Sequence, residues 1–244
     1  MKLIIIRHGD PDYSIDSLTE KGWREAKLLA DRISKLDVKA FYCSPLGRAK
    51  DTASLTLEKM GREATICDWL KEFGHCQVKL PYIPEGHTHI SWDFLPSFYT
   101  DKDGLFDAFD FMNVDFLKEG RMPELYKEVT DGLDELLLRH GYKRNGRYYE
   151  VIEPNMDTVV LFCHFGLECF LLGHLLNISP IALLHGTMAA PTSVTTLTTE
   201  EREEGIAIFR CSSFGDISHL YVADEPPAFA GRFCEMYSNA DERH

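Results

Sequence analysis

The sequence lacks the features that mark a disulfide-rich, zinc-binding or membrane-spanning protein. Its seven cysteines are scattered and form no CxxC pair, so neither a disulfide framework nor a structural zinc site is expected. The apolar run at the N-terminus breaks off at Arg7-His8, which is too short for a secretion signal or a membrane span. Internal repeats, low-complexity tracts and linkers are also lacking. We therefore expect a cytoplasmic protein that folds as one domain over residues 1–244.

Positive charge is also scarce. The chain has 26 Lys and Arg against 39 Asp and Glu, a formal net charge of −13. Such a surface repels polyphosphate and anionic lipid, so neither nucleic acid nor a membrane is an expected partner. A phosphorylated small molecule would have to be attracted by a local cationic pocket. With 244 residues, 44% of them hydrophobic, the chain is long enough to bury a sizeable core.

What is present is an alternation of short apolar runs with helical spacing. The runs predict strands at 2–6, 40–44, 65–69 and 158–163, and the helical spacing predicts helices at about 17–33, 45–61, 123–140 and 167–175. Ser17 and Glu20 have the spacing of a capping box, and Pro45 suits a first helical turn. Asn145-Gly146 predicts a type I′ hairpin, and an antiparallel pair is expected at 193–199 and 205–211. This order predicts an α/β three-layer sandwich with a mostly parallel central sheet flanked by helices.

The stretch from about 73 to 120 interrupts this alternation. It contains several prolines, a cluster of acidic residues and many aromatic residues, including Trp92, Phe94, Phe98, Tyr99 and Phe106. The spacing of Leu105, Phe109, Met112 and Phe116 suggests one helix inside it. A connection of this length is usually functional, so we expect an insertion or lid that shapes the substrate site. Its aromatic residues would either line that site or pack as a satellite core.

Chemically useful side chains follow three of the predicted strands. Arg7-His8-Gly9 follows the first, Ser44–Arg48 follows the second, and His164 follows the strand at 158–163. Ligands of parallel sheets bind outside the carboxyl ends of the strands, so these segments could converge. Arginine forks and helix N-terminal amides bind phosphate oxygens. Taken singly, each of these residues could equally be a packing histidine, a solvated arginine or a turn glycine.

Five segments, in order, resemble the histidine phosphatase superfamily, also called phosphoglycerate mutase-like. Arg7-His8-Gly9 is similar to its RHG signature, and four further segments are similar to its LTxxG, SPLxRAxxTA, LxE and second-histidine elements. In this chain they are residues 18–22, 44–53, 70–72 and 163–166. The order and spacing agree with the family over residues 2 to about 75 and about 157 to 221.

The resemblance implies a metal-independent phosphomonoesterase that needs no cofactor. His8 would be the nucleophile that forms a phosphohistidine. Arg7, Arg48 and His164 would hold the phosphoryl oxygens, with His164 also catalytic. Glu72 would donate a proton to the leaving alkoxide and then take one from water. The substrate would be a small phosphorylated metabolite.

The chain departs from the family pattern at the edges of the site. Tyr13 or Ser14 falls where many relatives have a phosphate-contacting Asn, and Thr192 stands where Asn is frequent in a PNxSV segment. Both positions, together with His185, are candidates for the pocket, although His185 could equally cap or pack. His219 is interpreted as structural, and His87 and His89 as solvated loop residues.

Two other functions are compatible with the same core. A phosphoglycerate mutase-type phosphotransferase would return the phosphoryl group to a bound sugar acid, and its pocket generally needs further basic residues. A non-catalytic module that binds phosphate or a phosphoprotein would have no use for Glu72. The acidic, aromatic insertion favours hydrolysis of a substrate with an apolar or neutral part. The oligomeric state is left open by the sequence.

Overall fold

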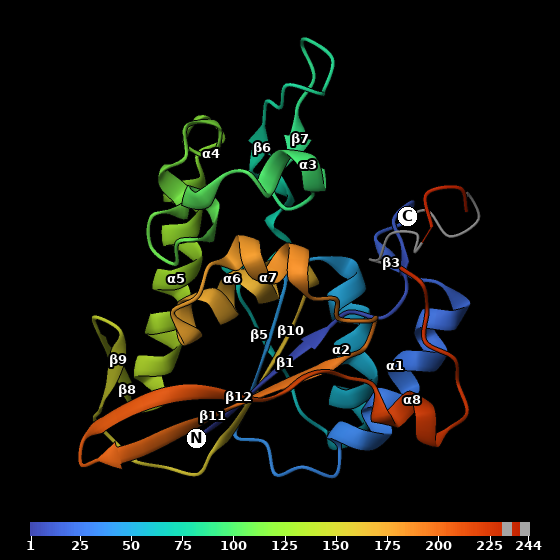
Figure 1. Cartoon of the computed structure of the whole chain (residues 1–244). Coiled ribbons are helices and arrows are strands. Elements are labelled where there is room, and N and C mark those ends of the chain that lie inside the picture. The colour runs from blue at the N-terminus through green and yellow to red at the C-terminus, as the bar shows by residue number, and fades with distance from the viewer. Residues whose placement is uncertain (231–235, 240–244) are drawn as a thin grey trace.

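The centre of the molecule is an eight-stranded mixed sheet (Figure 1). The computed structural model describes residues 1–230 and 236–239. One half of the sheet, in the order β5-β4-β10-β1, is parallel. Its strands are β1 (Lys2–Arg7), β4 (Ala40–Cys43), β5 (Thr65–Ile66) and β10 (Thr158–Cys163). The carboxyl ends of β4, β10 and β1 therefore meet at one edge, as predicted.

The other half of the sheet is antiparallel and continues from β1 in the order β11-β12-β9-β8. Its strands are β8 (Tyr142–Asn145), β9 (Tyr148–Val151), β11 (Val194–Glu203) and β12 (Ile206–Asp216). The predicted hairpins are present. The turn between β8 and β9 consists of Gly146 and Arg147, and only Gly146 has a positive φ. That pattern fits a type II′ turn rather than the predicted type I′ turn.

Alternate residues of the parallel strands face two different cores, because successive side chains of a strand point to opposite faces. Leu3 and Ile5 belong to one core, and Ile4 and Ile6 to the other. The first core is covered by α5 (Met122–Arg139), α6 (Phe165–Leu176) and α7 (Pro180–Gly186). On the other side of the sheet lie α1 (Glu20–Ile33), α2 (Gly47–Met60) and α8 (Ser218–Val222).

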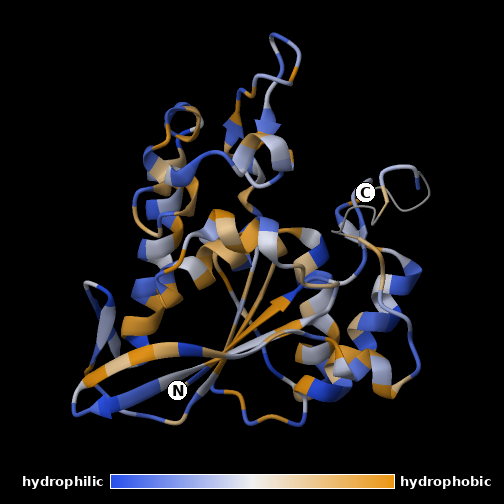
Figure 2. Cartoon of the chain, viewed as in Figure 1, coloured by the Kyte–Doolittle hydropathy of each residue, from blue (hydrophilic) through white to orange (hydrophobic). Residues whose placement is uncertain are grey.

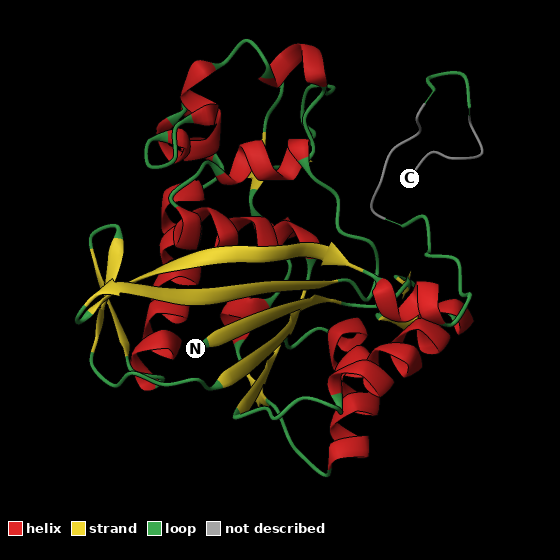
Figure 3. Ribbon diagram, turned by 60° about the horizontal axis from the view of Figure 1, so that its bottom comes forward, coloured by secondary structure: helices red, strands yellow, loops and turns green. Residues whose placement is uncertain are grey.

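This helix–sheet–helix arrangement confirms the predicted α/β sandwich, and Figure 3 shows helices on both sides of the sheet. In Figure 2, the middle of strand β1 is orange, because its apolar residues 3–6 are buried on both faces of the sheet. None of the helices in the described part of the chain has the length and apolarity of a membrane span. The described cysteines are free, and Cys234 lies outside the described residues.

Three element boundaries differ from the predictions. Helix α1 begins after Thr19, whose side chain accepts from the Gly22 N–H, whereas Ser17 donates to Asp51. Pro45 lies before the helix it was expected to open, because α2 begins at Gly47. The strand expected at 65–69 ends at Ile66, and a 3₁₀ turn at Asp68–Leu70 follows, which buries Leu70.

The insertion between about 73 and 120 consists of short elements and stands above α6 and α7 in Figure 1. They are 3₁₀ turns at Phe73–His75, Asp103–Phe106 and Phe111–Asn113, the hairpin of β6 (Gln77–Val78) and β7 (His89–Ile90), and helices α3 (Pro96–Tyr99) and α4 (Asp115–Glu119). The single helix expected over 105–116 is wrong. The Asp107 carboxylate accepts from the N–H groups of Phe109 and Asp110, and such local bonds compete with a helix.

Candidate active site

A cavity of about 260 Å³ opens at the carboxyl ends of the parallel strands. It is lined by Arg7, His8, Tyr13, Arg48, Glu72, Trp92, Phe165 and Gly166. Five of these residues were site candidates from the sequence, and they come from four separate segments. The insertion contributes Trp92, and the first turn of α6 contributes Phe165 and Gly166. The parallel topology therefore brings together the residues that the sequence places at strand ends.

His8 follows β1 and is almost fully buried. Its Nδ1 lies 2.7 Å from the Gly9 carbonyl oxygen, and because a carbonyl only accepts, Nδ1 carries the hydrogen. Burial and the charges of Arg7 and Arg48 hold the pKa of His8 well below its ordinary value, against the opposing effect of the Gly9 contact. The imidazole is therefore neutral near pH 7, with an unprotonated Nε2 that can act as a nucleophile.

His164 lies beside His8, with 5.1 Å between the ring centroids. Its Nε2 lies 2.8 Å from Ser44 Oγ, which itself accepts from the Leu46 N–H. Burial, followed by electrostatic interactions with His8, Arg48 and Arg7, holds the pKa of His164 well below its ordinary value. A neutral His164 that accepts the Ser44 hydroxyl proton at Nε2 carries its own hydrogen on Nδ1. Nδ1 then remains as a donor for a ligand.

The two arginines are held from behind by different partners. Arg7 is buried, and its Nη1 donates to the carbonyl oxygens of Ala189 and Ala230, at 2.5 and 3.1 Å. Arg48 Nη1 donates to Asp16 Oδ1 at 2.7 Å, and its guanidinium lies 5.4 Å from the centre of the Tyr13 ring. Asp16 also accepts from the Gly47 N–H at 2.6 Å. Both guanidinium groups are therefore fixed in place before any ligand binds.

Glu72 reaches the N-terminus of α6. Its Oε1 accepts from the N–H groups of Phe73 and Leu167, at 2.8 and 2.9 Å, and its Oε2 lies 3.3 Å from the Gly166 nitrogen. Backbone donors and the positive end of a helix dipole stabilise a carboxylate. The Glu72 carboxyl group is thus held at the cavity wall by its backbone partners.

Three nitrogen atoms around His8 are buried and have no hydrogen-bond partner among the described residues. They are Arg7 Nε, Arg48 Nε and His164 Nδ1. A buried donor without a partner costs about 1–3 kcal/mol, so these positions favour a ligand that brings acceptor oxygens. All three nitrogen atoms are hydrogen-bond donors in the protonation states described above, and the two arginine side chains are also cationic. The cavity is therefore suited to an oxyanion with several oxygens, such as a phosphoryl group.

Four of the predicted site residues lie outside the cavity lining. His164 is fully buried beside His8. Ser14 is exposed and donates to Asp12. His185 lies between α7 and the insertion, where its Nε2 accepts from the Phe94 N–H at 3.0 Å and its ring stacks on Phe94. Thr192 is buried behind the site, and its N–H donates to the His8 carbonyl at 3.1 Å. Of these, Thr192 supports the backbone of the nucleophile candidate without touching the cavity.

Several residues of the site carry little sequence signal. Trp92 stood out only as one aromatic residue of the insertion, and Asp16 and Phe165 were not identified as site residues. Asp16 has a left-handed φ of 49°, which Asp tolerates. Gly166 fits because a Cβ there would lie 2.6 Å from Glu72 Oε1. A glycine directly after the strand-end His164 and Phe165 could have indicated this close approach.

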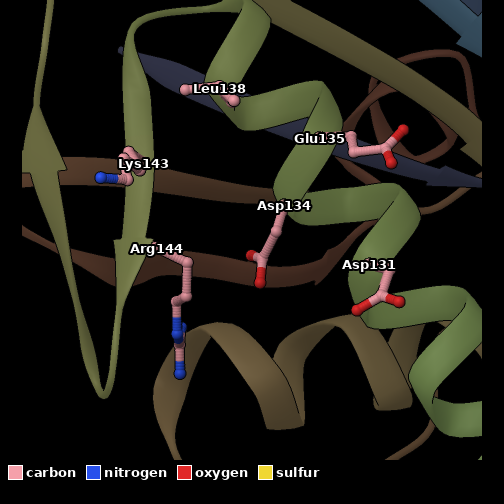
Figure 4. Close-up of a pocket in the computed structure, with 6 residues that line it drawn as sticks. All are labelled: Asp131, Asp134, Glu135, Leu138, Lys143 and Arg144. Carbon is pink, nitrogen blue, oxygen red and sulfur yellow. The ribbon is translucent and has the colours of Figure 1, made fainter.

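A second hollow, of about 280 Å³, lies between α5 and β8 (Figure 4). It is lined by Asp131, Asp134, Glu135, Leu138, Lys143 and Arg144. Asp134 accepts from the Tyr149 hydroxyl at 2.9 Å and lies 3.0 Å from His174 Nε2. Its three carboxylates outnumber its two cations, and the Arg144 guanidinium already donates to Tyr149, His174 and Asn177. This hollow is therefore a poorer match to a phosphate ester than the first cavity.

A family model described as the histidine phosphatase superfamily (branch 1) matches residues 3–94. The match includes Arg7, His8, Arg48, Glu72 and Trp92 of the cavity. The part of the chain over residues 3–94 is therefore similar to the histidine phosphatase superfamily.

Two curated relatives differ in activity. A 2,3-bisphosphoglycerate-dependent phosphoglycerate mutase of Thermoplasma acidophilum is 35% identical over 81 residues, which cover 29% of this chain and 40% of the mutase. A Schizosaccharomyces pombe protein named as a probable phosphatase is 26% identical over 234 residues, which cover 90% of this chain and 95% of that protein. The chain thus spans less than half of the mutase but nearly all of the yeast protein.

Solved structures share the fold. A phosphoserine phosphatase of Entamoeba histolytica, in complex with 3-phosphoglyceric acid, has a TM-score of 0.58 and 21% identity, covering 90% of this chain and 98% of its own. A mycobacterial glucosyl-3-phosphoglycerate phosphatase has a TM-score of 0.57 and 18% identity, covering 88% and 98%. At these identities the likeness establishes the architecture alone.

Proposed function

We propose that the protein is a metal-independent phosphomonoesterase that works through a phosphohistidine at His8. The observation that supports this most directly is the neutral His8, with Nε2 unprotonated, beside three buried nitrogen donors that have no partner in the described protein. A nucleophile and a set of oxyanion donors at one cavity are what phosphoryl transfer requires. The similarity of residues 3–94 to the histidine phosphatase superfamily agrees with this chemistry.

The reaction would run in two steps with one proton carrier. His8 Nε2 attacks phosphorus while the ester P–O bond breaks, and the alkoxide takes a proton from Glu72 and leaves as the alcohol. Water then attacks the phosphorus, the P–N bond breaks, and the proton of the water passes to Glu72. Arg7, Arg48 and His164 would stabilise the charge on the transferring oxygens.

Hydrolysis is a better match to the cavity than mutase activity. A mutase must hold a sugar acid so that its carboxylate is paired, whereas Arg7 and Arg48 are the cations among the described residues that line the cavity. A purely binding module would not need a carboxylate at the cavity wall. Transfer to glycerate phosphates in preference to water would favour the mutase.

The test is turnover of p-nitrophenyl phosphate in EDTA by wild type, His8→Ala and a matched control, His87→Ala. His87 is an exposed histidine of the insertion. Wild type and His87→Ala are expected to be equally active, and His8→Ala is expected to lose at least about 10³-fold in kcat. Turnover that survives in His8→Ala would overturn the proposed nucleophile.

Glu72→Gln tests the proton carrier separately. An activated ester such as p-nitrophenyl phosphate needs little help for its leaving group, whereas an alkyl phosphate needs a proton donor. We expect the variant to slow an alkyl phosphate about 10²-fold more than p-nitrophenyl phosphate in the phosphorylation step, measured by single-turnover kinetics. Equal slowing of both substrates would remove Glu72 from the acid role.

A further inference from the structure

The wall of the cavity beyond the phosphoryl donors is aromatic. Tyr13, Trp92 and Phe165 line it from three separate segments of the chain. Tyr13 is exposed and lies under the Arg48 guanidinium, whereas Phe165 is buried at the start of α6. Aromatic faces pack well against carbon-bound hydrogens, so this wall offers a surface for the carbon skeleton of the alcohol. Polar groups of the alcohol would have to be bound by polar atoms on the same wall.

Trp92 provides such a polar group. Its indole nitrogen is buried and has no hydrogen-bond partner among the described residues. An indole N–H only donates, and buried donors are nearly always paired, so a ligand with an acceptor atom would satisfy it. The segment around Trp92 is anchored on both sides, because the Ser91 N–H donates to Cys76 and the Phe94 N–H donates to His185. The backbone on both sides of Trp92 is therefore held in place.

The charge around Trp92 restricts the kind of acceptor. Glu72 lines the same cavity, and the described cations of the lining are Arg7 and Arg48, both of which face the phosphoryl site in the proposed mechanism. Among the described residues, the lining has no further cation to pair with a second anionic group on the substrate, and that group would also meet Glu72 in a chain of net charge −13. An uncharged oxygen avoids that repulsion and still accepts from the indole.

We propose that Trp92 makes the enzyme selective for phosphomonoesters of hydroxylated, otherwise uncharged alcohols, that is, sugar or polyol monophosphates. The indole N–H donates to a substrate hydroxyl near the ester, and the ring packs against the carbon chain. A cavity of about 260 Å³ suits a small substrate of this kind. The proposal rests on the phosphatase function proposed above and names the substrate class of that site.

Three substrates with the same three-carbon skeleton test it: glycerol 1-phosphate with free hydroxyls, n-propyl phosphate with none, and 3-phosphoglycerate with a carboxylate. We expect wild type to have the highest kcat/KM for glycerol 1-phosphate. Trp92→Phe keeps an aromatic ring but removes the N–H donor. It should lower the preference for glycerol 1-phosphate over n-propyl phosphate, measured as the ratio of their kcat/KM values, about fivefold, which corresponds to one hydrogen bond. Trp23→Phe, a matched control on the partly exposed face of α1, should leave the ratio unchanged.

An unchanged ratio in Trp92→Phe would overturn the role of Trp92, and a preference of wild type for 3-phosphoglycerate would overturn the uncharged class. If Trp92→Phe fails to fold, the wild-type ratio still decides: equal kcat/KM for glycerol 1-phosphate and n-propyl phosphate would overturn the proposal. Loss of the proposed function has a different signature. In that case none of the three substrates shows turnover that depends on His8.

Discussion

Thr192 holds a strained backbone conformation directly behind the proposed nucleophile. Its φ is 58°, in the left-handed region, which costs a β-branched residue about 1–2 kcal/mol. Its N–H donates to the His8 carbonyl, and its hydroxyl donates to Pro191 and lies 3.1 Å from His219 Nε2. Asn adopts this conformation readily and offers both a donor and an acceptor. We therefore expect Thr192→Asn to be more stable than wild type by about 1 kcal/mol.

For a chain of this size, that gain corresponds to a rise in Tm of about 2–4 °C. Thermal unfolding followed by circular dichroism, with urea unfolding for the free energy, measures it. Thr192→Ser is the control, because it keeps the hydroxyl and removes the methyl branch, and it should recover part of the gain. A loss of about 1 kcal/mol or more in both variants would show that the positive φ at Thr192 stores no relievable strain.

Three further predictions concern charge and close packing at the site. Burial raises the pKa of Glu168 to about 7, against the lowering effects of Thr195 and Arg7, so the folded state holds this proton more tightly than the unfolded one. The protonated Glu168 stabilises the fold below pH 4.5, and this effect is lost as pH rises through about 7. The free energy of unfolding of Glu168→Gln, measured in urea, should therefore rise by up to about 3 kcal/mol relative to wild type between pH 4.5 and 8. A difference that does not change with pH would contradict this. Gly166→Ala would place a Cβ 2.6 Å from Glu72 Oε1, so it should slow the hydrolysis of alkyl phosphates about as much as Glu72→Ala does. The double variant, Gly166→Ala with Glu72→Ala, should lose little more, and fully additive losses would contradict the prediction. Because the net charge is −13, raising the salt concentration from about 0.05 to about 0.3 M should not lower kcat/KM. A steep fall would show an attractive field at the cavity.

The parts of the molecule that follow from periodic patterns could be predicted from the sequence. The runs at β1 and β10 are apolar on both faces, which defines them as buried parallel strands, and their carboxyl ends then place His8 and His164 near each other. The same reasoning brings in Arg48 from the start of α2. The contacts among these three residues follow from the topology of the sheet. That topology could be predicted because the sequence shows the order of strands and helices.

The remaining parts depend on contacts that leave no periodic signal. Trp92 reaches the cavity because its neighbour Phe94 is anchored on His185, about ninety residues later in the chain. The helix expected at 105–116 is replaced by short turns because Asp107 binds backbone N–H groups locally. The positive φ of Thr192 leaves no periodic signal, and a threonine side chain disfavours that conformation.

The most direct test of the account is to trap the phosphoenzyme. Wild type mixed with a phosphomonoester and quenched within milliseconds should carry one phosphoryl group that is labile to acid and stable to base, and mass spectrometry should locate it on the peptide that contains His8. His8→Ala should carry none, while Glu72→Gln should accumulate it when an activated ester is used, because water lacks its proton acceptor. Full turnover with no phosphoenzyme, or a phosphoryl group on another residue, would contradict the proposed mechanism.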